Sequence, residues 1–244
     1  MRVAFFPGCL VDMFYPEVGE AAVHVLEKLG CQLEFPKEEV CCGQMFLNSG
    51  YTPETAAIAK QTIEAYSGYD TVVSLTGSCM HAIMEDYPAI FADDPEYLPR
   101  AVELAGHFHE FTDFIVNTLG VVDVGAHLNA VVTYHKSCHL TRLLGIEEPP
   151  LALLGAVDGL TYVEMEHADR CCGFGGTFSV KEPEISGQIV REKCQTILDT
   201  GADVVVGADQ PCLMNIWGCL NRMRETGETN RDVRVMHIAQ VLDS

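Results

Sequence analysis

Two adjacent cysteines followed by glycine occur twice in this chain, as Cys41-Cys42-Gly43 and Cys171-Cys172-Gly173. Each pair has an earlier cysteine 32 or 33 residues before it and a later one 37 or 40 residues after it. Eight of the eleven cysteines therefore form two copies of one pattern, which are Cys9, Cys41, Cys42 and Cys79, then Cys138, Cys171, Cys172 and Cys212. Any fold for this chain has to accommodate both copies, and we place the function at these eight sulfurs.

In the first copy, each cysteine position follows a predicted β-strand. Apolar runs predict strands over 3–6, 31–35 and 71–75, and helical spacing predicts helices over 17–29 and 52–66, the second with Thr52 as its N-cap. The carboxyl ends of parallel strands line the ligand crevice of an open sheet. We therefore expect three loops that carry cysteines to converge on one site.

The second half repeats this order of elements. Residues 87–98 are predicted to be a connection and 99–119 a helix that bridges the halves. Strands are then predicted over 130–134, 160–165 and 204–206, with a weak helix from 149 and a strong one over 182–200. The sequence thus predicts an internal duplication of two open, mainly parallel α/β domains, at residues 1–120 and 121–244.

Composition excludes some classes of function. The net charge of −20 argues against nucleic-acid binding, which needs a basic surface. No apolar run is long enough to span a membrane, and the N-terminus lacks the features of a signal peptide, so we expect a cytoplasmic protein. An odd number of cysteines in a reducing compartment favours metal or redox chemistry over a disulfide framework.

Four thiolates in each set suit zinc or an iron–sulfur cluster. Structural zinc sites usually take ligands two to four residues apart, whereas these pairs are adjacent and their partners lie more than thirty residues away. Gly43 and Gly173 fit a backbone that bends closely around a bulky group. Iron–sulfur binding is favoured, and zinc, a redox disulfide or an inert core remain as alternatives.

The motifs resemble those of the cysteine-rich CCG domain family. Members include the B subunit of heterodisulfide reductase and the iron–sulfur subunits of glycolate oxidase and anaerobic glycerol-3-phosphate dehydrogenase. The resemblance is greatest to the short two-domain branch that lacks a ferredoxin module and takes part in lactate utilization. The carrying residues span almost the whole chain: Phe6-Pro7-Gly8-Cys9, Cys41-Cys42-Gly43-Gln44, Gly77-Ser78-Cys79, Ser137-Cys138-His139, Cys171-Cys172-Gly173-Phe174-Gly175-Gly176 and Pro211-Cys212.

The resemblance implies an oxidoreductase subunit that passes electrons through iron–sulfur clusters, expected to be [4Fe–4S], within a cytosolic complex that oxidises L-lactate to pyruvate. It implies that each set of four cysteines holds one cluster. No flavin or nicotinamide motif is visible in this chain, so partners are implied. The expected partners are a ferredoxin-like iron–sulfur subunit and a small third protein.

One departure separates this chain from heterodisulfide reductase. The fuller motif of that enzyme ends in Cys-x-x-Cys, but Ala82 and Asn215 occupy the final positions here. Four thiolates fit an ordinary cluster better than the five-thiolate clusters that cleave disulfides. Electron transfer is therefore preferred, with thiol–disulfide reduction and a scaffold stabilised by zinc or disulfides as alternatives.

The remaining cysteines and the histidines carry weaker signals. Cys31 and Cys219 are predicted to be mainly core residues and Cys194 a core or surface residue, although Cys219 follows Cys212 closely enough to approach the second site. His81, His135 and His139 flank motif cysteines and could donate hydrogen bonds to a cluster, but a solvated or capping role is the simpler expectation. A third group, His24, His107, His109 and His127, is assigned to the surface or to packing.

Overall fold

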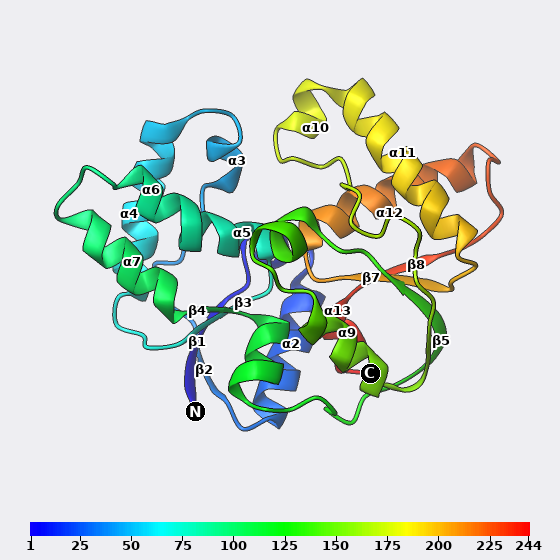
Figure 1. Cartoon of the computed structure of the whole chain (residues 1–244), viewed down its shortest axis with the longest axis horizontal. Helices are drawn as coiled ribbons and strands as arrows, with labels where there is room; N and C mark the ends of the chain where they lie inside the picture. Colours follow the sequence, from blue (N-terminus) through cyan, green and yellow to red (C-terminus); the bar gives the residue numbers. More distant parts are fainter. The chain divides into compact units, whose positions relative to one another are not determined.

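The computed structural model describes residues 1–244, which divide into two compact units, Met1–Gly120 and Val121–Ser244 (Figure 1). Each unit is built on its own four-stranded parallel sheet with helices around it. The predicted fold class, two similar parallel α/β units, is confirmed.

The two sheets have equivalent strand orders. In the first unit the order is β2-β1-β3-β4, from β1 (Arg2–Phe6), β2 (Gln32–Glu34), β3 (Val72–Ser74) and β4 (Phe108–Glu110). In the second it is β6-β5-β7-β8, from β5 (His127–Tyr134), β6 (Asp158–Tyr162), β7 (Val204–Gly207) and β8 (Arg234–His237). Every neighbouring pair is parallel, so the carboxyl ends of all four strands in a unit point to one edge.

Helices connect the strands. The first unit contains α1 (Cys9–Phe14), α2 (Pro16–Lys28), α3 (Gln44–Leu47), α4 (Thr52–Tyr66), α5 (Gly77–His81), the π-helical η1 (Ala82–Asp86), α6 (Tyr87–Ile90), α7 (Tyr97–His107), α8 (Phe111–Asp113) and the π-helical η2 (Phe114–Thr118). The second contains the π-helical η3 (Cys138–Leu143), α9 (Glu148–Ala156), α10 (Phe178–Lys181), α11 (Pro183–Asp199), α12 (Gln210–Glu225) and α13 (Ile238–Leu242).

The central strands are apolar along their length because helices cover both faces of a parallel sheet. In β1, residues 3–6 are buried without interruption, and β7 is buried throughout. Cys31 before β2 is 6% exposed and is a core residue as predicted, and Cys194 on α11, expected either in the core or on the surface, is fully buried. The sheets therefore form a rigid base for the segments at their carboxyl edges.

The fourth strand of each sheet was not predicted. The proposed helix over 99–119 is in fact interrupted, because α7 ends at His107 and residues 108–110 pair with β3. Leu104, Phe108 and Phe111 have helical spacing and are all buried, but they lie in α7, β4 and α8 respectively, so their shared burial imitated one continuous helix face. Strand β8 also lies outside the predicted elements.

Other expectations need smaller corrections. Residues 87–90, predicted to belong to a connection, continue the helical segment that starts at Gly77. The π-helical turn η1 lies just before Pro88, which lacks a backbone N–H. The N-cap of α4 is Tyr51 rather than Thr52, and β6 ends at Tyr162 rather than at Met165.

Candidate metal centres

Four thiols of the first unit meet at the carboxyl edge of its sheet. Cys9 follows β1 as the first residue of α1, the adjacent pair lies between β2 and α3, and Cys79 lies in α5 after β3. The Cys9 thiol donates to the Cys41 sulfur at 3.6 Å, and the Cys42 thiol donates to the Cys79 sulfur at 3.0 Å. Cys41 and Cys42 also interact, which links the four sulfurs into one group.

The second unit repeats this arrangement with Cys138 at the start of η3, a pair in the loop after β6, and Cys212 in α12. Cys171 accepts hydrogen bonds from the Cys138 and Cys172 thiols, and Cys172 also interacts with Cys212. The predicted convergence therefore occurs in both units. The adjacent pairs lie on loops, as expected. The other four cysteines, Cys9, Cys79, Cys138 and Cys212, differ from that expectation, since each lies in the first turn of a helix.

One cysteine in each group has strongly acidic character. Hydrogen bonds from Cys42 and then Cys9 lower the pKa of Cys41 to about 3, and those from Cys138 and then Cys172 lower the pKa of Cys171 to about 2. The backbone N–H groups of the following glycines also donate to these sulfurs, at 3.5 and 3.3 Å. Each group thus favours a thiolate, the form of cysteine that binds metals.

The glycine after each pair adopts the left-handed conformation, with φ of +79° at Gly43 and +80° at Gly173. A Cβ at Gly173 would lie 2.7 Å from the backbone oxygen of Ser186 on α11. The backbone therefore passes closely against a helix at this point. This contact alone requires a glycine, whereas the sequence pattern attributes the glycine to a bulky bound group.

Gly173→Ala should lower the free energy of unfolding of the second unit by about 2 kcal/mol, because left-handed strain adds to the clash with α11. Gly227→Ala is the matched control, since Gly227 has φ of +76° and open space around its Cα. Urea unfolding followed by fluorescence of Trp217, the single tryptophan of the chain, reports on this unit. Equal losses for the two variants would contradict the role of the α11 contact.

Ala82 and Asn215, which occupy the positions of the fifth cysteines in heterodisulfide reductase, have structural roles here. Ala82 is fully buried in η1, whereas Asn215 of α12 donates from Nδ2 to the carbonyl oxygen of Cys172 at 2.8 Å. In the first unit the hydroxyl of Tyr87 makes the equivalent bond to the Cys42 carbonyl, also at 2.8 Å. Both pairs are thus fixed through the backbone of their second cysteine.

Among the flanking histidines, His135 departs furthest from the solvated or capping role expected. Its side chain is 1% exposed, and a ring nitrogen lies with the sulfurs of Cys172 and Cys212 in a group whose ligand atoms are all within 4.8 Å of one another. Burial, followed by the charge of Lys193, lowers the pKa of His135 to about 3, so the ring is neutral at physiological pH. The other two differ, because His81 pairs with Asp86 at 3.2 Å and His139 lies 3.5 Å from the Cys138 sulfur.

Lys193 is a buried cation that sequence reasoning missed. It lies on α11, fully buried, and its Nζ donates to the carbonyl oxygens of His167 at 2.8 Å and Ala168 at 3.0 Å. These carbonyls belong to the segment that leads to Cys171, and His167 has φ of +54°, an uncommon value for a residue with a side chain. In a helix of mixed charge, nothing in the sequence distinguished Lys193 from an exposed lysine.

Glu110 was missed because β4 was missed. It is fully buried at the carboxyl end of that strand, where Oε2 caps α8 by accepting from the backbone N–H groups of Thr112 and Asp113, at 2.8 and 3.0 Å. The other oxygen, Oε1, has no hydrogen-bond partner. Burial raises the pKa of Glu110 to about 7 from its ordinary 4.5, so the protonated form favours the folded state.

Because folding raises this pKa, Glu110 contributes most stability below pH 4.5, and the contribution is lost as the pH rises through 7. Between pH 4.5 and 8, the unfolding free energy of the wild-type chain should fall by about 3 kcal/mol relative to that of Glu110→Gln. Urea unfolding of the metal-free, reduced chain followed by circular dichroism measures this. The exposed Glu103→Gln variant is the control, and parallel pH profiles for wild type and Glu110→Gln would contradict the prediction.

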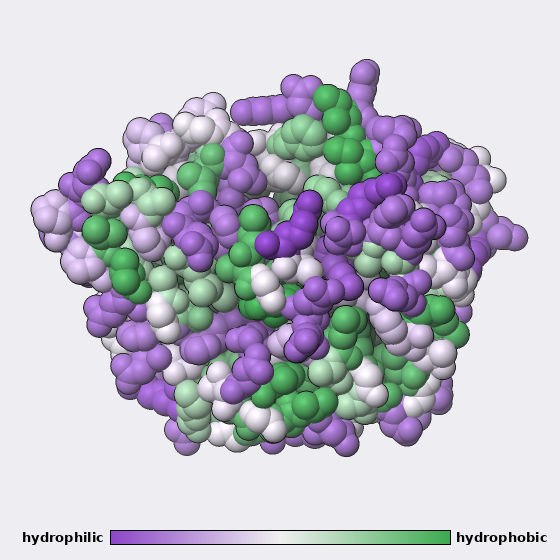
Figure 2. Space-filling view, in the orientation of Figure 1, coloured by the Kyte–Doolittle hydropathy of each residue, from purple (hydrophilic) through white to green (hydrophobic).

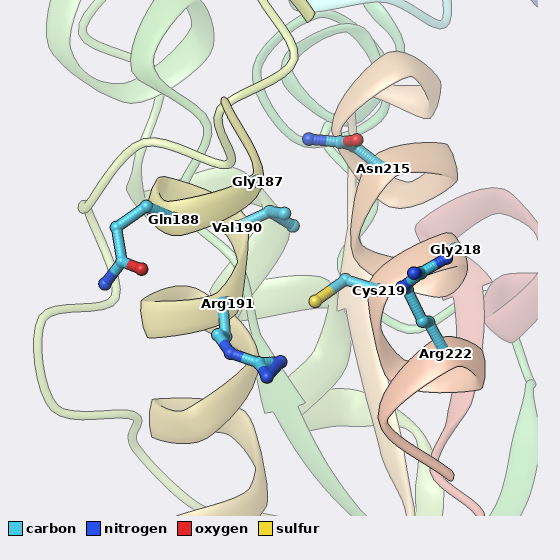
Figure 3. A pocket seen from close by; sticks show the side chains of 8 residues that line it. All are labelled: Gly187, Gln188, Val190, Arg191, Asn215, Gly218, Cys219 and Arg222. Atoms are coloured by element: carbon cyan, nitrogen blue, oxygen red, sulfur yellow. The ribbon is translucent and has the colours of Figure 1, made fainter. Parts of the chain in front are cut away.

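Cys219 has its main interaction with Cys194 and not with the four-thiol group of its unit. It lines an open pocket of about 430 Å³ between α11 and α12, together with Arg191, Asn215 and Arg222. Figure 3 shows its sulfur directed toward α11, with the Arg191 side chain below it. The expectation of a mainly core role is therefore met only in part.

The donor sets fit a thiophilic metal or cluster. All eleven cysteines are free thiols, and each group of four draws on separate segments at a strand edge. In each group, two sulfurs are well buried while Cys9 and Cys41, or Cys138 and Cys171, remain half-buried and reach the surface. The fold and these sites define a duplicated α/β protein with a thiolate-rich centre in each half.

Comparison with known proteins agrees with this class. The model of the cysteine-rich domain family, CCG, matches residues 3–84 and 132–217. The chain belongs to this family, together with proteins named lactate utilization protein A. It is 49% identical to the one from Bacillus subtilis strain 168, over the whole of both chains. It is 51% identical to the one from Exiguobacterium strain ATCC BAA-1283 / AT1b, with 99% of this chain and 97% of the relative aligned.

A solved structure supports the fold. A hypothetical protein from Helicobacter pylori superposes with a TM-score of 0.68 at 11% identity, over 99% of this chain and 48% of that one. None of the helices is long and apolar enough to cross a membrane. Figure 2 shows hydrophilic side chains over much of the visible surface, with smaller apolar areas between them, as the strongly negative charge suggests.

Proposed function

We propose that this chain is an iron–sulfur electron-transfer subunit of a cytoplasmic complex that oxidises L-lactate to pyruvate and supports growth on lactate. The observation that carries the proposal is the convergence of four free thiols in each of two equivalent units. The full-length relatives named lactate utilization protein A direct it toward lactate. The expected partners are a ferredoxin-like iron–sulfur subunit and a small third subunit.

In this proposal, Cys9, Cys41, Cys42 and Cys79 hold one centre, and Cys138, Cys171, Cys172 and Cys212 hold the other. Each centre would supply reversible one-electron chemistry, which thiolate-bound iron–sulfur clusters provide over a wide range of potentials. The protein supplies a rigid strand edge, acidic thiols at Cys41 and Cys171, and backbone N–H groups that reduce charge on those sulfurs. The half-buried cysteines give electrons a route to the surface.

Two features favour electron transfer over disulfide cleavage. Ala82 is buried in η1 without a donor atom, and Asn215 uses its amide to hold the Cys172 carbonyl. Neither position offers the fifth thiolate that a disulfide-cleaving cluster takes in heterodisulfide reductase. The chain also has no visible flavin or nicotinamide motif, so a partner is expected to take the hydrogen atoms of lactate.

The test is reduction by substrate in the presence of natural partners. A tagged chain purified anaerobically with its co-purifying proteins should lose its visible iron–sulfur absorption on addition of L-lactate, and the chain alone should not. Heterodisulfide and glycolate are the comparison substrates. Centres that dithionite reduces but L-lactate leaves oxidised, with every co-purifying protein present, would contradict the lactate assignment.

A further inference from the structure

The two sites differ at the residue three positions before the first cysteine. In the first unit this residue is Phe6, which is fully buried and packs against Tyr66 and Phe108 with ring centroids 5.5 and 5.7 Å away. In the second unit it is His135, at the carboxyl end of β5. The same backbone position thus carries a hydrocarbon ring in one unit and a ring with two nitrogens in the other.

His135 has unused hydrogen-bonding capacity. The side chain is 1% exposed, and neither Nδ1 nor Nε2 has a hydrogen-bond partner. An unsatisfied buried polar group costs about 1–3 kcal/mol, so such groups in native proteins usually have a partner or a ligand. A phenylalanine at this position would avoid the cost, as Phe6 does in the first unit.

The free nitrogen lies where a metal ligand would be. A nitrogen of His135 and the sulfurs of Cys172 and Cys212 all lie within 4.8 Å of one another, and all three side chains are buried. A neutral imidazole is a common metal ligand, and mixed histidine and cysteine sets occur in both zinc and iron–sulfur sites. His135 directly follows β5, Cys172 lies in the loop after β6 and Cys212 lies on α12, so three separate segments of one unit supply these donors.

We propose that His135 is a metal ligand of the second centre, alongside Cys172 and Cys212, so that the second unit binds through nitrogen and sulfur while the first binds through sulfur alone. This rests on the proposed function for the identity of the metal as iron in a cluster. The two centres are then chemically different despite the duplication, because an ordinary [4Fe–4S] cluster takes one protein ligand at each of its four irons and the imidazole of His135 would take the place of one of the four thiolates.

Pulsed EPR on the holoprotein tests the ligand directly. Wild type labelled with ¹⁵N-histidine and reduced anaerobically should show hyperfine coupling from a directly bound histidine nitrogen. His135→Phe, which copies Phe6, should lose that coupling and keep the signal of the first centre. The control is His139→Phe, which removes the imidazole beside Cys138 and should retain the coupling. A labelled wild type with no bound nitrogen overturns the proposal even if the variant fails to fold.

A second arm separates this inference from the proposed function. If the purified chain contains no iron, Co²⁺ is titrated into the reduced metal-free protein and its visible spectrum is recorded. His135→Phe should then weaken binding at the second site at least tenfold, which would support the ligand and reject the iron–sulfur role. Unchanged Co²⁺ affinity would overturn the His135 proposal. Iron–sulfur clusters without nitrogen coupling would overturn it and leave the proposed function standing.

Discussion

Cys172→Ala should abolish the second metal centre and leave the first intact. Cys172 is buried, interacts with both Cys171 and Cys212, and forms with His135 and Cys212 a group whose ligand atoms all lie within 4.8 Å of one another. Its removal takes away a thiolate that no nearby cysteine can replace, because Cys194 and Cys219 interact with each other instead. The expected result is loss of about half of the bound iron and of one of two EPR signals.

Cys42→Ala is the matched variant and should remove the other half of the iron. Cys194→Ala is the control, since Cys194 is equally buried but packs in the core between α11 and α12. Its iron content should equal that of wild type. Retention of full iron by Cys172→Ala, or equal losses in Cys194→Ala, would show that the cysteines bind no metal in the pattern proposed.

Lys193→Met should destabilise the second unit by about 4 kcal/mol, since it removes two charge-assisted hydrogen bonds worth roughly 2 kcal/mol each. Methionine keeps most of the volume but leaves the carbonyl of His167 with only the Arg170 N–H and that of Ala168 with only the Lys136 N–H. The turn at His167, which has positive φ, then loses the side chain that ties it to α11. Since this segment leads to Cys171, we also expect faster loss of iron from the second centre.

Urea unfolding followed by Trp217 fluorescence measures the stability of this unit, and the iron released to a chelator over time measures retention. The control is Lys181→Met, which removes a lysine that is exposed at the end of α10. If Lys193→Met is as stable as Lys181→Met, the hydrogen bonds of the buried ammonium only offset the cost of removing its charge from water, and the prediction is wrong. Loss of iron from the first centre at the same rate would contradict a local effect.

Much of the fold could be predicted because the central strands and long helices carry simple patterns. Residues 3–6 and 204–206 are continuous apolar runs, and α4 begins and ends where Thr52 and Tyr66 were expected to bound a helix. Strands β4 and β8 escaped prediction because each has only three or four residues, at least half of them polar or charged, which form too short a pattern to recognise. Their position is fixed by pairing with β3 and β7, which is tertiary information.

The site was also predictable only in part. The spacing of the cysteines predicted which sulfurs would meet, since the order of strands and the order of cysteines along the chain are the same in both units. The supporting residues were not predictable, because Lys193, Asn215 and Glu110 resemble ordinary helix or loop residues until their burial and partners are known. His135 stood beside a motif cysteine in the sequence, but only its burial and unpaired nitrogens separate it from His81 and His139.

The central claim is that both groups of four cysteines bind iron–sulfur clusters. Its most direct test is anaerobic purification of the full chain, followed by measurement of iron, acid-labile sulfide and zinc. We predict roughly eight iron and eight sulfide ions per chain, the content of two [4Fe–4S] clusters, with little zinc. Stoichiometric zinc without sulfide, or a chain that binds neither metal, would contradict it.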